Sequence, residues 1–416
     1  MLSRRRFLGY PALTPALLAQ EAPLRLAIIG TAYRYGSELQ TIADRFLVGY
    51  PRDGDWHMPN VHVVSLYVEP GAAGASDPLA DLSAERSREF GFRVCRNIPE
   101  ALRCGGSQIA VDGVISVVEQ GSYPRNRKGQ ILYPRYDFFE QCVQVFAEER
   151  RVVSFFNHGS LSFSFREARS MVEISERLRF PLLAGSSLPV TWRLPDTDIP
   201  LGAQIQDAIV VCPFAGMEFD ALEAMQCMLE RRKGGETGVR AVQYLEGDDV
   251  WQAGETGRWS KDLLSSALSR SDAPQGLTVV DGRTQDMAAS GVLPQLVKDP
   301  AAIAIEYIDG TRATLLRLDG ADMDFTFSAR VAGHGLIATQ FFRSPVPFVS
   351  YSAGLTAKIE EMMKTRTAPY PARRTLLTGG ILEAALTSRA RLNQRLDTPH
   401  LSVRYSPSVE SQYLRT

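Results

Sequence analysis

The 416-residue sequence has few residues of the kinds that hold metal ions. It contains five cysteines and five histidines, and no two cysteines have the close, paired spacing of a zinc site. We therefore expect no metal centre and mostly buried thiols, while the spacing leaves one disulfide open as an alternative. The cysteines are Cys95, Cys104, Cys142, Cys212 and Cys227.

The sequence also lacks an excess of charge and a long apolar run. Lysine and arginine number 46 against 47 acidic residues, a net charge of -1, so nothing in the charge balance favours nucleic acid as a partner. No apolar run reaches the roughly 18 residues that span a bilayer, so we do not expect an integral membrane protein. With 44% hydrophobic residues the chain can bury full cores, and its length predicts about two domains.

Residues 1–22 have the features of a twin-arginine export signal. Ser3-Arg4-Arg5-Arg6-Phe7-Leu8 precedes a short apolar stretch that ends near Ala19. We expect the twin-arginine export machinery to carry the folded protein to a periplasmic or secreted location, a route suited to an enzyme whose cofactor is inserted in the cytoplasm. A frayed basic N-terminus is the alternative.

From residue 24 onward, short β-branched runs alternate with helical patterns. The first pair is a strand over 24–29 and a helix over 37–47, where Ser37 and Gln40 have the spacing of a capping box. This β-α-β order predicts a Rossmann domain over 23–188, built on a doubly wound parallel sheet. The further expected strands are 61–68, 92–95, 112–118, 152–156 and 181–185, and the further helices 84–90, 98–102, 136–150 and 165–179.

Ligands of such sheets bind at the carboxyl ends of the strands, which directs attention to the loop after the first strand. In Gly30-Thr31-Ala32-Tyr33-Arg34-Tyr35-Gly36, the first glycine fits the tight bend of a dinucleotide turn, alanine stands where the second glycine belongs, and the last glycine comes late. We expect this loop to bind NAD or NADP through Gly30, Thr31, Tyr33, Arg34 and Gly36, with the arginine fork pairing with a phosphate.

The second strand ends at Glu69, where a carboxylate can accept hydrogen bonds from ribose hydroxyls. The distance from the turn exceeds the usual spacing of about 20 residues because 49–60 is interpreted as an inserted loop. An acidic residue here favours NAD over NADP, although Arg34 favours the opposite choice. An ordinary solvated strand end is an equal alternative for Glu69.

Several segments resemble the glucose-fructose oxidoreductase / inositol dehydrogenase / MocA (Gfo/Idh/MocA) family. They are the strand and glycine turn, EFGFRVCRNIPEAL, DGVISVV, FPLLAGSSLPVTWRLP and ALEAMQCMLERRKGGETGVRAVQYLEGDDVW, and the likeness, to an exported branch, extends to about Trp251. The resemblance implies an α/β protein with a Rossmann domain and, over 189–416, a second α/β domain with an open, mainly antiparallel sheet. It also implies a nicotinamide cofactor and a carbohydrate-like substrate, and we expect a homo-oligomer.

Two family positions are changed in this chain. The family's Glu-Lys-Pro turn, whose lysine acts on the reacting hydroxyl, is replaced by Phe156-Asn157-His158-Gly159-Ser160. We expect His158 to serve as the auxiliary acid and Asn157 to contact the cofactor, with a surface turn as the alternative.

The family's histidine base falls at Asp220, and its last carboxylate at Glu223. Residues three apart share one helix face, so repulsion between the two carboxylates raises one pKa into the range of a base. Simple stabilisation by the helix dipole is the alternative. For substrate contacts we expect Arg193 beside Trp192, and Tyr133 and Arg135 at the strand ends.

The remainder of the chain predicts a sheet and closing helices. Strands over 303–308 and 313–318 flank the hairpin turn at Asp309-Gly310, a third covers 325–331, helices cover 221–232, 355–364 and 376–395, and a polar tail from Leu396 wraps the surface or a partner subunit. The leading hypothesis is an NAD(P)-dependent oxidoreductase of a sugar or polyol. The alternatives are a catalytically degenerate sugar-binding or interaction protein, and an NAD-dependent glycosidase-like enzyme.

Overall fold

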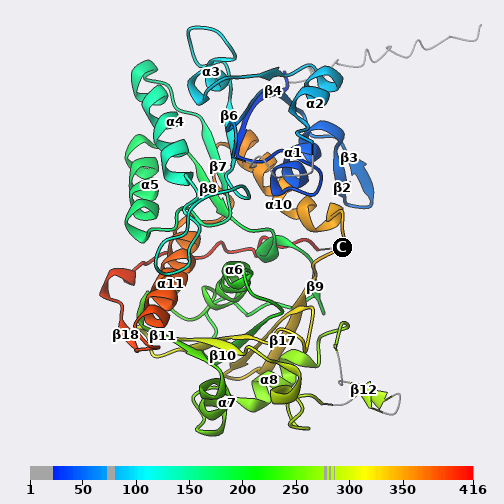
Figure 1. Cartoon of the computed structure of the whole chain (residues 1–416), viewed down its shortest axis with the longest axis vertical. Helices are drawn as coiled ribbons and strands as arrows, with labels where there is room; N and C mark the ends of the chain where they lie inside the picture. The colour runs from blue at the N-terminus through cyan, green and yellow to red at the C-terminus, as the bar shows by residue number, and fades with distance from the viewer. Residues whose placement is uncertain (1–21, 73–79, 276–278, 281–282, 285, 416) are drawn as a thin grey trace, which may run out of the picture.

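The computed structural model describes residues 22–72, 80–275, 279–280, 283–284 and 286–415. It contains two large sheets, one in each half of the molecule (Figure 1). The expected export signal lies outside the described residues apart from Ala22. No helix among the described residues is long and apolar enough to cross a membrane.

The first sheet has six parallel strands in the order β5-β4-β1-β6-β7-β8. This is the doubly wound order, with the switch point between β1 and β6, so the predicted Rossmann sheet is confirmed. The strands are β1 (Leu24–Gly30), β4 (Val61–Val68), β5 (Arg93–Val94), β6 (Gly113–Val117), β7 (Ser154–His158) and β8 (Leu182–Gly185).

Helices cover both faces of this sheet. One face carries α3 (Ile98–Arg103), α4 (Arg135–Glu149) and α5 (Phe165–Leu178), and the other carries α1 (Glu38–Val48) and α10 (Val349–Thr365). The short α2 (Ser83–Phe90) precedes β5. The predicted cap is present, because Ser37 Oγ accepts a hydrogen bond from the Gln40 amide at 3.1 Å.

The second sheet has eight strands in the order β18-β11-β14-β15-β10-β16-β17-β9. Its pairs are antiparallel except for β10 with β15, which confirms the expected architecture. The strands are β9 (Arg193–Leu194), β10 (Ile205–Cys212), β11 (Val239–Glu246), β14 (Ala301–Tyr307), β15 (Arg312–Arg317), β16 (Phe325–Val331), β17 (Gly335–Phe341) and β18 (Leu396–Asp397).

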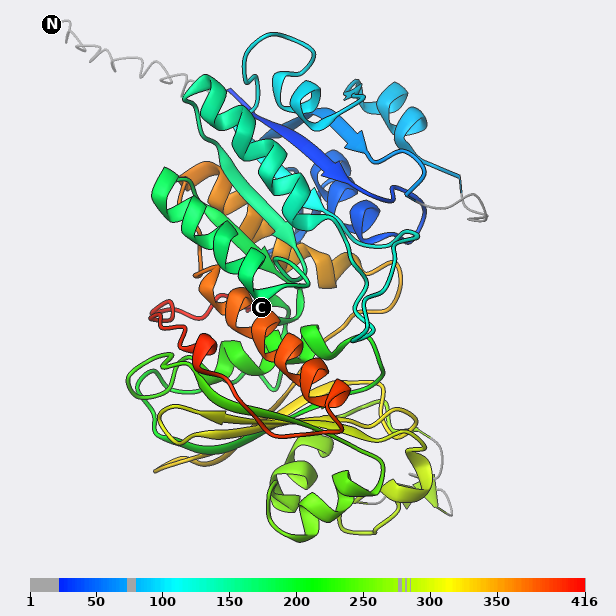
Figure 2. The same ribbon diagram turned by 60° about the vertical axis from the view of Figure 1, so that its left-hand side comes forward.

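Both faces of the second sheet are covered. Helices α6 (Glu218–Leu229) and α11 (Arg373–Ala390) lie between it and the first domain, and α7 (Asp248–Glu255) and α8 (Lys261–Leu268) cover the far face. The short α9 (Leu293–Leu296) and a small hairpin of β12 (Val279–Val280) and β13 (Arg283–Thr284) follow. After the second sheet the chain returns to the first domain, where α10 packs on the first sheet. Helix α11 then leads back to the boundary between the two domains (Figures 1 and 2).

Of two smaller expectations, the loop over 49–60 is corrected and the mostly buried thiols are confirmed. Residues 49–60, interpreted as a loop, contain the antiparallel strands β2 (Tyr50–Arg52) and β3 (Asp55–His57), where Tyr50 and His57 both contact Glu360 of α10. The five cysteines all lie within the described residues and are free thiols, four of them buried.

Candidate active site

A cavity of about 400 Å³ lies between the two domains. This volume falls within the range of about 300–1,000 Å³ that is usual for small-molecule sites. The first domain contributes the segments around Glu119, Tyr133 and Arg135, which follow β6, and around Ser160, which follows β7. The second domain contributes Asp220 at the start of α6, and α11 closes one side. Because strands β6 and β7 end here, the cavity occupies the expected edge of the Rossmann sheet.

A cluster of charged side chains includes two residues that line the cavity, Glu119 and Arg135. His158, the last residue of β7, places Nδ1 at 3.4 Å from Oε1 of Glu119 and Nε2 at 3.9 Å from Oε2 of Glu38. The Arg135 guanidinium donates to Glu119 at 3.0 Å and to Ser160 at 3.1 Å. Glu119 therefore receives two positive partners, and His158 faces two carboxylates.

These contacts fix the protonation of the His158–Glu119 pair. Burial by itself lowers the pKa of His158, but the Glu119 carboxylate, helped by Glu38 and Asp220, raises it to about 9. Burial likewise opposes ionisation of Glu119, but His158 and Arg135 outweigh it and lower its pKa to about 2. At neutral pH the pair is an imidazolium against a carboxylate.

Asp220 differs from Glu119 because it has no cationic partner in direct contact among the described residues. Burial, with the neighbouring charges of Glu119 and Glu38 adding to it, raises the pKa of Asp220 to about 7 despite the opposing effect of His158. Asp220 lines the cavity. It is thus a carboxyl group that exchanges a proton near neutral pH at a point where a bound molecule can reach it.

Replacing Glu119 with glutamine is expected to lower the pKa of His158 from about 9 towards or below its ordinary value of about 6.5. The reason is that the strongest force favouring the charged ring disappears while burial remains. The measurement is an NMR titration of the ring proton, assigned with His158→Asn. Because the ring binds its proton more tightly when folded, protonated His158 stabilises the native state fully below about pH 6.5, as long as Glu119 stays ionised, and loses this effect as the pH rises through about 9.

The matched control is Glu38→Gln, which removes the more distant carboxylate and should shift the His158 titration less. A His158 pKa that stays near 9 in Glu119→Gln would contradict the assigned pairing.

The loop after β1 has the close packing of a dinucleotide turn. A Cβ atom at Gly30 would lie 2.6 Å from the carbonyl oxygen of Val117, so only glycine fits where this turn passes β6. Gly36 has a φ of +74° and donates its amide to Gln40 Oε1 at 2.7 Å. Arg34 is half-buried in the same loop. The tight bend at Gly30 therefore meets the steric requirement for the first glycine of a dinucleotide turn.

Two other residues of this loop point inward rather than toward a ligand. Thr31 is fully buried and its hydroxyl donates to the Glu119 carbonyl at 2.8 Å. The Tyr33 ring is buried, with its hydroxyl 2.7 Å from Asp44. Both side chains hold the loop in shape, and this corrects their assignment as direct cofactor contacts.

Glu69 follows β4 and stands at the expected ribose position. It is half-buried and accepts a hydrogen bond from the hydroxyl of Tyr123, a residue of the long loop after β6. Its carboxylate therefore already interacts with a hydroxyl group, which is the chemistry predicted for it, although here the group belongs to the chain.

The structure does not bring Glu223 to the cavity. The side chain is fully buried on α6 beside Gly185, and it accepts hydrogen bonds from Thr378 at 2.5 Å and Thr375 at 3.4 Å, both on α11. Burial raises its pKa to about 7, against the lowering effects of Arg374 and Thr378. Glu223 has the pKa of a base without access to a substrate, which leaves Asp220 as the candidate.

Three further expected site residues have contacts within the chain. Arg193 is buried against Asp198 at 2.8 Å, with its guanidinium 3.9 Å from the centre of the Tyr413 ring. Trp192 packs against Phe342 at the joint between the domains. The Asn157 amide donates to the carbonyl groups of its own turn, His158 and Ser160, at 3.1 and 3.0 Å. Their hydrogen bonds and ring contacts are structural, whereas Tyr133 and Arg135 do line the cavity.

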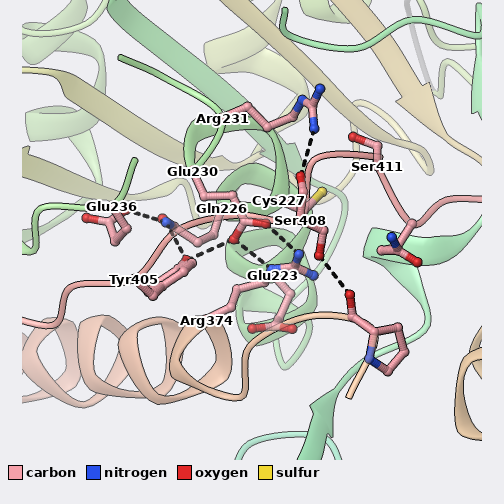
Figure 3. Close-up of polar contacts among 12 residues, drawn as sticks. Glu223, Gln226, Cys227, Glu230, Arg231, Glu236, Arg374, Tyr405, Ser408 and Ser411 are labelled. Atoms are coloured by element: carbon pink, nitrogen blue, oxygen red, sulfur yellow. Dashed lines mark hydrogen bonds and ion pairs between the residues drawn. The ribbon is translucent and has the colours of Figure 1, made fainter. Parts of the chain in front are cut away.

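A buried ion pair fixes the helix that carries Asp220. Arg374 of α11 donates two hydrogen bonds to Glu230, which follows α6, at 2.9 and 2.5 Å, and the hydroxyl of Tyr405 in the C-terminal tail donates to the same carboxylate at 2.9 Å. Gln226 joins Tyr405 to Glu236 (Figure 3). The expected wrapping tail thus contributes to the interior between α6 and α11.

Sequence reasoning did not single out Glu119, Glu38 or Tyr123. One signal was present, because Glu119 directly follows the predicted strand 112–118 and so had to lie at the ligand-binding edge. Glu38 was concealed by its ordinary role as an acidic residue in the first turn of a helix.

No family model matches the chain, and no curated protein matches it at a significant level. Solved structures do match. GenD2 from gentamicin A biosynthesis, solved in complex with NAD, aligns with a TM-score of 0.55 at 12% identity, over 90% of this chain and 96% of its own. The myo-inositol dehydrogenase from Lactobacillus casei, solved with NAD(H) and myo-inositol, aligns with a TM-score of 0.53 at 12% identity, over 90% and 96%.

These neighbours are dehydrogenases of the Gfo/Idh/MocA type, so the resemblance drawn from the sequence is confirmed at the level of the fold. The chain has the two-domain architecture of that class. At 12% identity the likeness concerns architecture, and the roles of individual residues rest on the geometry described above.

Proposed function

We propose that this protein is an NAD(P)-dependent oxidoreductase acting on a hydroxyl or carbonyl group of a sugar- or polyol-like molecule. The observation that carries the proposal is Asp220, a carboxyl group with a pKa near 7 that lines a cavity at the carboxyl ends of the Rossmann strands. The fold shared with NAD-complexed dehydrogenases supports it.

The chain's own residues supply the proton chemistry. Asp220 takes the proton from the substrate hydroxyl when the carbinol is oxidised and returns it in the reverse direction. The buried imidazolium of His158, kept charged by Glu119, adds positive potential beside Asp220 and so stabilises negative charge that develops on the substrate oxygen. Tyr133 and Arg135, which line the same cavity, orient a polyhydroxylated ring through the aromatic face and the guanidinium fork.

A bound nicotinamide dinucleotide would supply the acceptor or donor of hydride. The residues that would hold it are the tight turn at Gly30, the first turn of α1 beyond Gly36, and the carboxylate of Glu69. The close approach at Gly30 and the hydroxyl-binding carboxylate of Glu69 are the observations that fit such a molecule.

The expected result is that freshly purified protein either releases a nicotinamide dinucleotide on denaturation, seen by mass spectrometry, or is thermally stabilised by added NAD(P). A panel of polyols and aldoses then yields reduced nicotinamide with at least one member. If no dinucleotide is found and none raises the melting temperature, the sugar-binding alternative replaces the proposal. Release of an aglycone without net change of the cofactor would instead favour the glycosidase-like alternative.

A further inference from the structure

A short stretch of the loop after β6 crosses the edge where a dinucleotide would lie. This stretch, residues 119–123, contacts the segments that follow both β1 and β4. Thr31, after β1, donates its hydroxyl to the Glu119 carbonyl at 2.8 Å and lies 3.0 Å from that of Gln120. Ser122 donates its amide to Ala72, after β4, at 2.7 Å. The 119–123 segment thus crosses the carboxyl edge of the sheet from β1 to β4.

On the side of α1, the segment occupies a donor that faces the expected pyrophosphate position. The backbone amide of Glu38, in the first turn of α1, donates to Oε1 of Gln120 at 3.3 Å. Amides of the first helical turn have no partner within the helix and are the groups that bind phosphate oxygens in nucleotide folds. Gln120 supplies an oxygen atom in the place of a phosphate oxygen.

On the side of β4, the segment occupies the acceptor expected for ribose. The hydroxyl of Tyr123 donates to the Glu69 carboxylate. The backbone of the segment also packs closely against the residues after β4. A Cβ atom at Gly121, whose φ is +114°, would lie 2.6 Å from the Ala72 carbonyl oxygen. One hydroxyl and one amide oxygen of the chain therefore engage the same two groups that a ribose hydroxyl and a phosphate would engage.

We propose that residues 120–123 are an autoinhibitory plug that a nicotinamide dinucleotide must displace on binding, while Glu119 keeps its contacts with His158 and Arg135. The inference rests on the proposed function and adds a closed resting state to it. The displacement reaches the substrate cavity, because Tyr123 packs edge-on against Tyr133 with ring centres 5.5 Å apart, and Arg135 lies over the Tyr133 ring. Since Glu119, Tyr133 and Arg135 line that cavity, the dinucleotide binds first and reshapes the wall that receives the substrate.

The experiment measures the affinity of the full chain for NADH and NADPH by calorimetry. Tyr123→Phe removes the hydroxyl but leaves Glu69 intact, and Gln120→Ala frees the Glu38 amide. Because either change makes opening easier, the combined variant is expected to bind about tenfold or more tightly than wild type. The matched controls are Tyr136→Phe, which loses a contact with Ser170, and Gln144→Ala, which loses one with Glu148, and both should bind like wild type.

Hydrogen exchange provides a second readout that does not depend on turnover. Addition of NADH to wild type is expected to speed amide exchange at Ser122, because its amide loses its partner, the Ala72 carbonyl. Equal affinities in all variants, together with unchanged or slower exchange on NADH addition, would overturn the plug while leaving an NAD(P)-binding enzyme. Failure of wild type and of both loop variants to bind any dinucleotide would overturn the proposed function itself. Binding by the variants alone would support both.

Discussion

Replacing Asp220 with asparagine is expected to lower kcat by about 10²- to 10⁴-fold, the usual contribution of a positioned general base, while the affinity for the dinucleotide stays the same. Asp220 is the cavity-lining carboxyl group whose pKa lies at about 7, and the amide cannot accept the proton. The measurement is steady-state oxidation of the best substrate from the polyol panel, with dinucleotide affinity determined in parallel.

The pH dependence gives this prediction a second test. Activity of wild type in the oxidative direction should rise with pH through about 7, as Asp220 loses its proton, and fall near 9, as His158 loses its charge. In Asp220→Asn the rise should disappear. The matched control is Glu223→Gln, the same change one helical turn later, which should keep kcat within a few-fold because that side chain lies outside the cavity. Equal losses in both variants would indicate a structural effect and contradict the assignment of Asp220.

The secondary structure of the first domain was largely predictable because each of its elements carries its own local signal. The strand predicted over 61–68 has those bounds in β4, and the helix predicted over 165–179 differs from α5 by one residue. Short apolar runs that alternate with capped amphipathic helices are compatible with few other assignments of secondary structure. The strands β10, β11 and β17 of the second domain were not assigned individually, since their order in the sheet depends on pairings between distant segments.

The candidate site was only partly predictable, because helical spacing does not tell which side of a helix faces a cavity. Asp220 and Glu223 are three residues apart, as a shared face requires, and the charge of Asp220 adds to burial in raising the pKa of Glu223. Yet α11 packs over the second carboxylate and supplies two threonine hydroxyls to it. That helix follows about 150 residues later, and no local pattern reveals its position.

Arg193 illustrates the same limit for a binding residue. Beside Trp192 it has the composition of a carbohydrate contact, but the C-terminal tail returns to cover it, with Tyr413 against its guanidinium and Ser411 on its partner Asp198. A guanidinium that the tail encloses cannot meet a substrate. The local sequence thus indicated what the Arg193 side chain can bind. It did not indicate which residues surround that side chain, because they come from the end of the chain.

Replacing Arg374 with methionine is expected to destabilise the protein by about 3–5 kcal/mol, because it leaves the buried Glu230 carboxylate without its cation. The two side chains are 4% and 3% exposed, and their two hydrogen bonds join α11 to the end of α6 (Figure 3). The measurement is urea unfolding followed by circular dichroism. The neighbouring Arg373→Met is the control, because its pair with Glu176 is 42% and 49% exposed and should contribute no more than about 1 kcal/mol.

Removing both charges separates the cost of an unpaired ion from the value of the pair. The double variant Arg374→Met, Glu230→Leu should recover most of the stability lost in the single variant, since a buried pair replaced by apolar groups of similar volume is often neutral. Because α6 carries Asp220 and α11 lines the cavity, the single variant should also lose activity at temperatures where it remains folded. A single variant as stable as the Arg373 control would show that α6 and α11 are held by apolar packing alone, and that the ion pair does not fix the position of the base.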